Sequence, residues 1–305
     1  MVEPGVRVAS VLVIGLGLIG GSLARALRAS RFAPRIIGFD RDPACAARAG
    51  ELGVVDVVAD ALPGALAMAD LVVLAVPTLA VEAVLEEVRA HAHAQVVLTD
   101  VASVKGSVVE AAARVFGSLP PRFVPGHPIA GAERSGVDAA SAELFRQHRV
   151  ILAPGAGTDP EALATVRAMW RCTGAEVVEM DCVTHDRVLA LTSHLPHMLA
   201  FTLVDALARE DASEDIFRFA AGGFRDFTRI ASSDAVMWRD IALANRAGLL
   251  SALDVFTARL AELRALVECA DGPALEAVFL RARAARGRYL RWLERDAGAG
   301  QGGSR

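Results

Sequence analysis

Two patterns of apolar residues divide the chain. Through the first 180 residues, short apolar runs alternate with stretches of helical spacing, as they do where strands and helices take turns. The predicted strands are Val8–Ile14, Ile36–Asp40, Leu71–Val76, Val96–Asp100, Arg122–Pro125, Arg149–Ala153 and Glu176–Met180. The helices predicted between them include Ser22–Ser30, Pro43–Leu52, Thr78–Ala90 and Val104–Val115. This alternation predicts an α/β fold with a doubly wound parallel sheet.

The second part of the chain keeps only the helical pattern. From about Asp181 onward, Ala, Leu and Arg recur at helical spacing through Val183–Arg209, Ser233–Val267 and Ala274–Arg295. The last residues are rich in glycine and cannot form a core. We therefore predict a Rossmann-type nucleotide-binding domain over residues 1–180, an all-α helical domain over 181–296 and a flexible tail over 297–305.

A glycine-rich turn follows the first predicted strand. Gly15, Gly17 and Gly20 have the spacing G-x-G-x-x-G, and Asp40 closes the next strand about twenty residues further on, as in dinucleotide-binding turns. Gly15 permits the turn, Gly17 lets a pyrophosphate approach, and Gly20 lets the helix lie close to the strand. The residues expected to contact the cofactor are Gly15, Gly17, Leu18, Ile19, Gly20, Asp40, Arg41, Val76 and Pro77.

The acid at the end of the second strand bears on the identity of the cofactor. Asp40 would accept hydrogen bonds from the ribose hydroxyls and repel a 2′-phosphate, which favours NAD over NADP. Arg41 could instead pair with that phosphate, so NADP remains the alternative.

Composition narrows the class of protein. Hydrophobic residues make up 53% of the chain, enough for a core, and the net charge of −4 with no block of Lys or Arg gives no indication of nucleic acid or membrane binding. The apolar stretch Val8–Ala24 has its glycines at cofactor spacing, so we interpret it as a buried strand and helix. The four cysteines form no C-x-x-C pair, which predicts reduced thiols, no metal site and a cytoplasmic protein.

Two polar turns follow predicted strands. In Thr99-Asp100-Val-Ala-Ser103-Val-Lys105-Gly106, Ser103 is as plausible a helix cap as a site residue. In Pro125-Gly-His127-Pro-Ile-Ala-Gly131, prolines and glycines hold a histidine close to the expected cofactor. Oxidation of an alcohol needs a base, so we expect His127 to be catalytic and the rate to fall on the acid side near the ordinary histidine pKa of about 6.5.

Two further polar groups occur in the helical part. In Leu191-Thr-Ser193-His194-Leu-Pro196-His197, the serine and the second histidine share a helix face, and the proline predicts a kink. We expect one of these histidines to face a ligand. In Gly222-Gly-Phe-Arg225-Asp-Phe-Thr-Arg229, two arginines offer forks for carboxylates, although Arg225 could pair with Asp226 or Asp240 instead. The predicted ligand is a small polyanion.

Taken together and in this order, the motifs resemble those of the prephenate/arogenate dehydrogenases of tyrosine biosynthesis. The resemblance extends from Val8 to about Arg295 and rests on Asp100-x-x-Ser103-x-Lys105, the turn around His127, Ser193-His-Leu-Pro-His197 and the run from Gly222 through Arg229. It implies NAD(P)-dependent oxidative decarboxylation of prephenate to 4-hydroxyphenylpyruvate and carbon dioxide, with hydride transfer from C4 to the nicotinamide; with the cofactor that Asp40 favours, the reaction is NAD-dependent.

The resemblance also implies roles for single residues. His127 would be the base for the 4-hydroxyl, Ser103 would support it, and Arg229 would anchor a substrate carboxylate. The other residues implied around the substrate are Ser193, His197, Ser233 and Trp238. The family's dimers form through the helical domain, so a homodimer is expected, and we expect neither a following ACT domain nor a preceding chorismate mutase.

Three alternatives stay open. The first is an arogenate or dual-specificity cyclohexadienyl dehydrogenase, because the substrates differ only in a keto or an amino side chain; His197 mildly favours the keto acid. The second is another two-domain hydroxyacid dehydrogenase or imine reductase, which would lack these motifs. The third is an NAD-sensing module without catalysis, which would not need His127. Production of NADH from prephenate separates these hypotheses.

Overall fold

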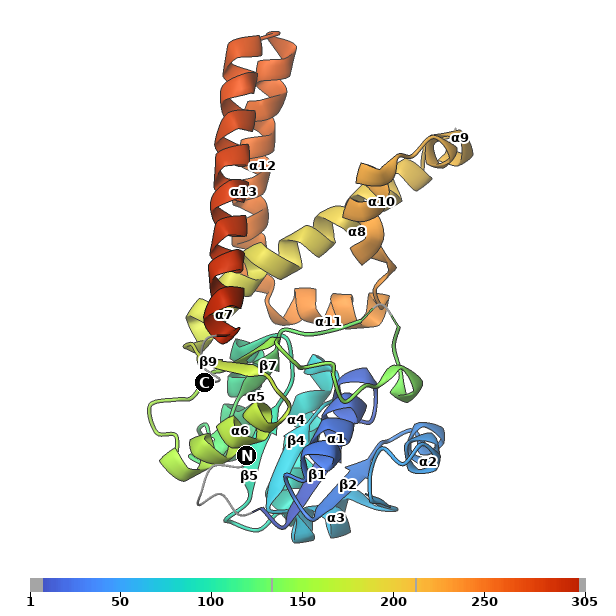
Figure 1. Ribbon diagram of the computed structural model, residues 1–305, viewed down its shortest axis with the longest axis vertical. Helices are drawn as coiled ribbons and strands as arrows, with labels where there is room; N and C mark the ends of the chain where they lie inside the picture. Colours follow the sequence, from blue (N-terminus) through green and yellow to red (C-terminus); the bar gives the residue numbers. More distant parts are fainter. Residues whose placement is uncertain (1–7, 133, 212, 302–305) are drawn as a thin grey trace. The chain divides into compact units, whose positions relative to one another are not determined.

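The computed structural model describes residues 8–132, 134–211 and 213–301 (Figure 1). The chain divides into two compact units, with the boundary between Leu249 and Leu250. The first unit contains every strand of the described chain and all of the residues expected to form a site.

A six-stranded parallel sheet forms the centre of the first unit, in the order β3-β2-β1-β4-β5-β6. Its strands are β1 (Ser10–Ile14), β2 (Arg35–Phe39), β3 (Val57–Val58), β4 (Leu71–Leu74), β5 (Val97–Asp100) and β6 (Phe123–Val124). This order is that of dinucleotide-binding sheets and confirms the predicted Rossmann-type fold. Of these six strands, only the two-residue β3 was not predicted.

The last three strands form a sheet of their own. They are β7 (Gly126–Pro128), β8 (Arg149–Leu152) and β9 (Glu176–Glu179). β7 is antiparallel to β8, and β8 is parallel to β9. The strands predicted over Arg149–Ala153 and Glu176–Met180 are therefore present but lie outside the six-stranded parallel sheet, and the turn expected around His127 contains the short strand β7. Pro125 separates β6 from β7 and has no N–H for a ladder, so the chain leaves the first sheet there.

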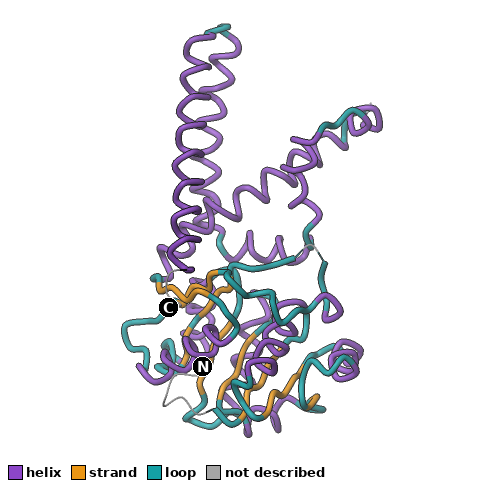
Figure 2. Tube along the Cα trace, in the orientation of Figure 1, coloured by secondary structure: helices purple, strands orange, loops and turns teal. Residues whose placement is uncertain are grey.

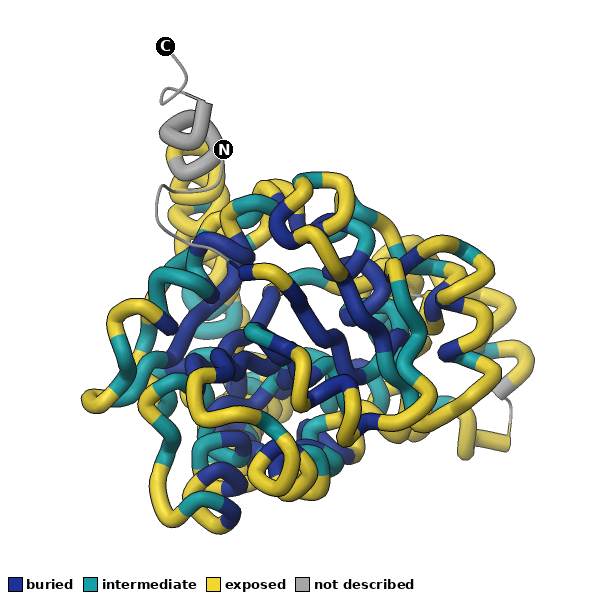
Figure 3. The backbone as a smooth tube through the Cα atoms, turned by 90° about the horizontal axis from the view of Figure 1, so that it is seen from below, coloured by how far each residue is buried: buried dark blue, intermediate teal, exposed yellow. Residues whose placement is uncertain are grey.

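Helices cover both faces of the six-stranded sheet. One face carries α1 (Leu18–Ser30), α2 (Pro43–Glu51) and α6 (Pro160–Cys172), and the other carries α3 (Leu62–Met68), α4 (Val81–His91) and α5 (Lys105–Phe116). In β1, Val11 and Val13 join the first of these clusters while Leu12 and Ile14 join the second, as the two-residue period of a strand requires. The strands are buried along most of their length (Figure 3). Two short 3₁₀ turns, η1 (Thr78–Ala80) and η2 (Val137–Ala139), complete this part.

Only helices follow β9 in the described residues, as predicted (Figure 2). They are α7 (Cys182–Leu189), the π-helical turn η3 (Ala190–His194), α8 (Leu195–Ala208), α9 (Ser213–Arg218), α10 (Gly222–Thr228), the 3₁₀ turn η4 (Arg229–Ser232), α11 (Ala235–Ala244), α12 (Arg246–Glu268) and α13 (Gly272–Gln301). The helix predicted over Ser233–Val267 is interrupted at Asn245, where α11 ends and α12 begins.

The second unit consists of the greater part of α12 and of α13. Ala270 has a positive φ of 51° in the short connection, and the carboxylate of Asp271 accepts a hydrogen bond from the amide of Ala274 at 3.0 Å to start α13. α13 ends at Gln301, so its last turn includes residues that the sequence analysis assigns to a tail. Residues 302–305 of that tail lie outside the described residues.

Candidate active site

The glycine turn between β1 and α1 shows which of its glycines the fold itself requires. Gly15 has φ of 95°, and a Cβ there would lie 2.3 Å from the carbonyl oxygen of Ala75. A Cβ on Gly20 would lie 1.9 Å from the carbonyl oxygen of Gly15. A Cβ on Gly17 would meet no atom within 4 Å. Gly17 is also the N-cap of α1, and it has no side chain to cap the helix. The open space in front of this helix N-terminus fits a pyrophosphate.

Asp40 lies directly after β2 and is fixed by backbone amides. Its carboxylate accepts hydrogen bonds from the amide of Leu16 at 2.8 Å and from the amide of Asp42 at 2.9 Å. The acid is therefore held beside the glycine turn. Arg41 next to it is exposed, and Val76 follows β4 so closely that its amide borders Gly15. The contacts expected for a dinucleotide thus gather at the carboxyl ends of β1, β2 and β4.

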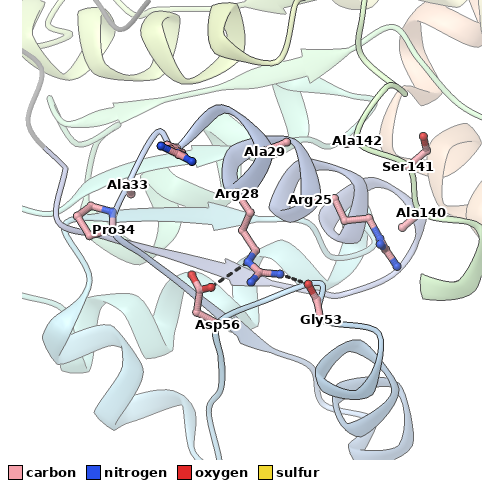
Figure 4. Close-up of a pocket in the computed structure, with 11 residues that line it drawn as sticks. Arg25, Arg28, Ala29, Ala33, Pro34, Gly53, Asp56, Ala140, Ser141 and Ala142 are labelled. Atoms are coloured by element: carbon pink, nitrogen blue, oxygen red, sulfur yellow. Dashed lines mark hydrogen bonds and ion pairs between the residues drawn. The ribbon is translucent and has the colours of Figure 1, made fainter.

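A separate hollow of about 920 Å³ lies along α1, away from this edge (Figure 4). Arg25, Arg28 and Arg31 line it, together with residues that precede β2 and β3. The guanidinium of Arg28 donates to Asp56 and to the carbonyl of Gly53. Because ligands of open α/β sheets bind at the carboxyl ends of the strands, this hollow is not part of the candidate site.

A buried ion pair fixes the peptide of Gly126, just before the expected catalytic histidine. The ammonium of Lys105 pairs with the carboxylate of Asp100, and neither side chain is exposed. Lys105 also donates to the carbonyl of Gly126 at 2.6 Å, and Asp100 accepts from the amide of Gly126 at 3.1 Å. Burial lowers the pKa of Lys105, and Asp100 opposes that shift. Asp100 ends β5 and Lys105 begins α5, so this strand–helix turn positions β7.

His127 lies in β7, opposite Ile151 of β8, and is 8% exposed. Its Nδ1 is 2.9 Å from Nε2 of His185 on α7. The Nδ1 of His185 is in turn 2.7 Å from a carboxylate oxygen of Asp186. Burial lowers the pKa of His127 well below its ordinary value, and neighbouring His185, Lys105 and His194 add to the effect. The imidazole is therefore neutral near pH 7 and able to take up a proton.

Asp186 connects α7 to the first turn of α5. Its two carboxylate oxygens accept the amides of Lys105 and Gly106, each at 2.8 Å. These are free N–H groups at a helix start, where a negative charge is favoured. The N-cap of α5 is Val104 and makes no side-chain cap, so the cap alternative for Ser103 is wrong. A site role for half-buried Ser103 stays a prediction.

The helix irregularity expected near Pro196 is a π-helical turn. Across it, the amide of Leu195 donates to the carbonyl of Ala190, five residues earlier. The turn precedes the proline and changes the hydrogen-bond partners where Pro196 has no N–H to offer. The Nδ1 of His197 lies 2.9 Å from the Ser193 carbonyl oxygen, so the His197 ring contacts the backbone of Ser193, and a shared face for the two side chains stays a prediction.

The two histidines of this segment have different environments. His197 stacks on Trp238, with ring centroids 3.6 Å apart. His194 is 1% exposed, and its Nδ1 lies 3.1 Å from the amide nitrogen of Asn245, which also donates to the carbonyl of Asp186. Burial lowers the pKa of His194 to about 4. The Nε2 of His194 and the Nε1 of Trp238 are buried without a hydrogen-bond partner in the described chain.

The arginine-rich segment meets the same group of rings. Arg229 opens η4, which contacts α8, and its charge lies close enough to His197 to lower the pKa of that histidine, a shift caused mainly by burial. Ser233 follows η4 and is half-buried. Arg225 is exposed and pairs with Asp226 at 3.8 Å, whereas Asp240 pairs with Arg239. Of the two arginines that the sequence offers for a carboxylate, Arg229 is the one close to His197.

These contacts connect the predicted groups, and they add three residues that the sequence analysis missed. His185, Asp186 and Asn245 link the turn around His127 to the segment around His194. The His-Asp pair in α7, the first helix after the last strand, is the signal that could have found two of them. Asn245 gives no such signal.

Comparison with known families covers most of the chain. Residues 23–179 match the family model for the nucleotide-binding domain of prephenate dehydrogenase. Residues 181–281 match the model for the prephenate dehydrogenase dimerization domain.

Individual relatives agree with this match. The chain is 39% identical over 279 residues to cyclohexadienyl dehydrogenase of Zymomonas mobilis, covering 90% of this chain and 94% of that protein. It is 40% identical over 282 residues to prephenate dehydrogenase of Bacillus subtilis, covering 90% of this chain and 74% of that protein. A crystal structure of prephenate dehydrogenase from A. aeolicus in complex with hydroxyphenyl propionate and NAD+ is 35% identical, with a TM-score of 0.87 over 93% of this chain and 99% of that one.

Proposed function

The chain belongs to the prephenate dehydrogenase family, and on that premise we propose that it oxidatively decarboxylates prephenate with NAD, giving 4-hydroxyphenylpyruvate and carbon dioxide for tyrosine biosynthesis. Family membership makes it a nicotinamide-dependent oxidoreductase. One observation carries the finer proposal: neutral His127 follows the carboxyl edge of the sheet with one ring nitrogen already bonded to His185. The other ring nitrogen is left for a substrate.

His127 takes the proton of the 4-hydroxyl in this proposal. When bound, the nicotinamide supplies the acceptor for the hydride that leaves C4. Lys105 and Asp100 bind the backbone C=O and N–H of Gly126, the residue before His127. The ring therefore has a fixed position for this transfer. As the ring carboxylate leaves and the ring becomes aromatic, the protonated imidazole can return its proton to the phenolate oxygen. Ser103, at the start of the neighbouring turn, supports His127.

The residues around His197 form the proposed substrate contact. Trp238 packs flat against His197 and holds it toward the charge of Arg229. A planar guanidinium binds a carboxylate with two parallel hydrogen bonds. We propose that Arg229 anchors a substrate carboxylate, with Ser193, His197, Ser233 and Trp238 around the ligand.

Prephenate is favoured over arogenate by the chemistry of this group. The described side chains offer N–H donors without partners, on His194 and Trp238, together with the cation of Arg229. The keto-acid side chain of prephenate presents only acceptors to such donors, whereas the ammonium of arogenate would need acceptors. The similarity to a cyclohexadienyl dehydrogenase keeps dual specificity as the second candidate.

NAD is the proposed cofactor because Asp40 carries its charge where an adenosine ribose would lie. The amides of Leu16 and Asp42 hold the carboxylate there, so it cannot easily turn away from a 2′-phosphate. Exposed Arg41 is the residue that would act for NADP instead.

We also propose a cytoplasmic homodimer, with residues 1–180 binding the nucleotide and 181–296 binding the substrate and forming the dimer. By length and hydropathy, Cys182–Ala208 could cross a membrane. An interface between two copies would cover the same apolar surface, and the second family model describes a dimerization domain. The four cysteines are free, as expected in a reducing compartment.

The test is the rate of NADH formation, followed by near-ultraviolet absorbance, with each substrate and each cofactor in turn. We expect the highest kcat/KM for prephenate with NAD. Equal rates with arogenate would establish the dual-specificity alternative. An enzyme that reduces neither cofactor with either substrate would contradict the proposal.

A further inference from the structure

Two buried histidines and the partly buried Asp186 form a line of hydrogen-bonded side chains that begins at the proposed base. His127 Nδ1 lies 2.9 Å from His185 Nε2, and His185 Nδ1 lies 2.7 Å from Asp186 Oδ1. Neither histidine is more than 8% exposed, so water does not compete for these bonds. The order of donors and acceptors along this line decides which nitrogen of His127 carries hydrogen.

The order starts from Asp186, which is fixed as an acceptor. Burial alone would raise the pKa of this carboxyl, but the hydrogen bonds from His185, Lys105 and Gly106 lower it overall. A Cβ on Gly106 would lie 2.7 Å from Asp186 Oδ2, so only glycine allows this approach. With the backbone amides of α5 donating to both oxygens, Asp186 can only accept from the ring of His185.

The rest of the line follows from the chemistry of neutral imidazole, which has one donor and one acceptor nitrogen. His185 donates from Nδ1 to Asp186, so its Nε2 must accept. His127 then donates from Nδ1, which leaves its Nε2 without hydrogen. We propose that His185 and Asp186 are positioning residues that hold His127 in the Nδ1–H form, with Nε2 free to act as the base.

This inference rests on the proposed function, which identifies the proton that His127 takes up as that of the substrate hydroxyl. In the reaction, the O–H bond of the substrate hydroxyl breaks and a bond from its proton to His127 Nε2 forms. The proton on Nδ1 stays in place and bonds more strongly to His185, while His185 and Asp186 keep their own protonation. When His127 returns the proton to the phenolate oxygen, the line is back in its starting state.

Charge around the ring explains the need for a carboxylate at the far end. The groups that face His127 are His185 from α7, Lys105 from α5 and His194 from η3. Burial and the positive charge of Lys105 disfavour a positive charge on His127, and the charge of Asp100 is already paired with Lys105. Asp186 provides the remaining negative charge, and His185 transmits it through the hydrogen bond.

A pair of variants separates this role from simple packing. His185→Phe keeps a ring of similar size but offers no acceptor to His127. In His185→Gln, the amide oxygen can accept the Nδ1–H of His127. We expect kcat to fall by about 10²-fold or more in the Phe variant and clearly less in the Gln variant, with the Kd for NAD unchanged in both. His148→Phe, at an exposed position, is the control and should keep full activity.

Nitrogen-15 NMR of the ring provides a readout that does not depend on activity. In the free wild-type protein, the His127 signal, assigned by its loss in His127→Asn, should show a protonated Nδ1 and an unprotonated Nε2. A protonated Nε2 in the neutral ring would overturn the inference, and so would equal kcat losses in the Phe and Gln variants. If wild type oxidises no prephenate or arogenate, the proposed function fails, while the NMR measurement still decides the order of protons.

Discussion

Lys105 and Asp100 form an ion pair with no exposed side-chain surface, and together they bind the backbone N–H and C=O of Gly126. A charge left alone in such a place is costly, since neither water nor a partner stabilises it. Lys105→Met should therefore lower the free energy of unfolding by about 3–5 kcal/mol, measured by urea denaturation. Arg114→Met removes one partner of the exposed pair with Glu82 and should change little. Comparable losses in the two variants would contradict the importance of burial.

His127→Asn should lower kcat by about 10²–10⁴-fold and leave NAD binding intact, because asparagine cannot take up a proton. Activity assays and NAD titration measure the two effects. A variant with near-normal kcat would remove His127 from the chemistry and direct attention to His197.

The structure changes the expected pH dependence of kcat/KM, for which the sequence predicts an acid limb at a pH of about 6.5. Burial lowers the pKa of His127, so the neutral form persists to lower pH and the fall in kcat/KM should come well below that value. Profiles of wild-type kcat/KM between about pH 5 and 8 test this shift. A limb at or above the ordinary histidine pKa would show that another group controls the rate.

Arg229→Ala should weaken prephenate binding by roughly 2–5 kcal/mol, or about 30-fold or more in KM, because a substrate carboxylate loses its bidentate partner. The KM for NAD should stay nearly constant. Arg225→Ala is the matched control, since Arg225 is exposed and pairs only loosely with Asp226. If both KM values rise together in Arg229→Ala, the arginine has a structural role.

Asp40→Asn should relax the preference for NAD. The amide oxygen still accepts one of the two backbone amides, so the turn should keep its shape while the repulsion of a 2′-phosphate disappears. The ratio of kcat/KM for NAD and NADP measures this. A wild-type preference for NADP would instead assign the phosphate to Arg41.

His194 should make folding stability depend on acid. Its pKa is about 4 in the fold and about 6.5 in an unfolded chain, so the unfolded chain binds the proton more readily. Stability is complete above pH of about 6.5 and declines as the pH falls toward 4, by at most roughly 3 kcal/mol. Melting temperatures of wild type and His194→Gln across this range should diverge at neutral pH and converge in acid. Parallel curves would contradict the role of His194.

Local signals explain why much of the fold could be predicted. Apolar runs at strand spacing and the turn of Gly15, Gly17 and Gly20 depend on geometry within a few residues, which the sequence shows directly. The pairing of β7 with β8 depends on where separate strands meet, and the apolar pattern is the same for either sheet.

The residues of the candidate site differ in the same way: some could be predicted from the sequence and others could not. His127 could be found from the prolines and glycines beside it. The His-Asp pair at 185 and 186 could be noticed, but the role of Asp186 could not be predicted, because its partners Lys105 and Gly106 are 81 and 80 positions away. The tight fit of a carboxylate against a helix start depends on the three-dimensional fold, and the residues next to Asp186 in the sequence do not reveal its partners.

The close approach of Gly106 to Asp186 has an evolutionary consequence. The two residues belong to separate helices, yet a side chain at position 106 would displace the carboxylate and disturb the ring of His127 two hydrogen bonds away. Selection should therefore act on positions 106 and 186 jointly. In descendants of this sequence, drift at either position is tolerated only with compensation at the other, and the two should covary.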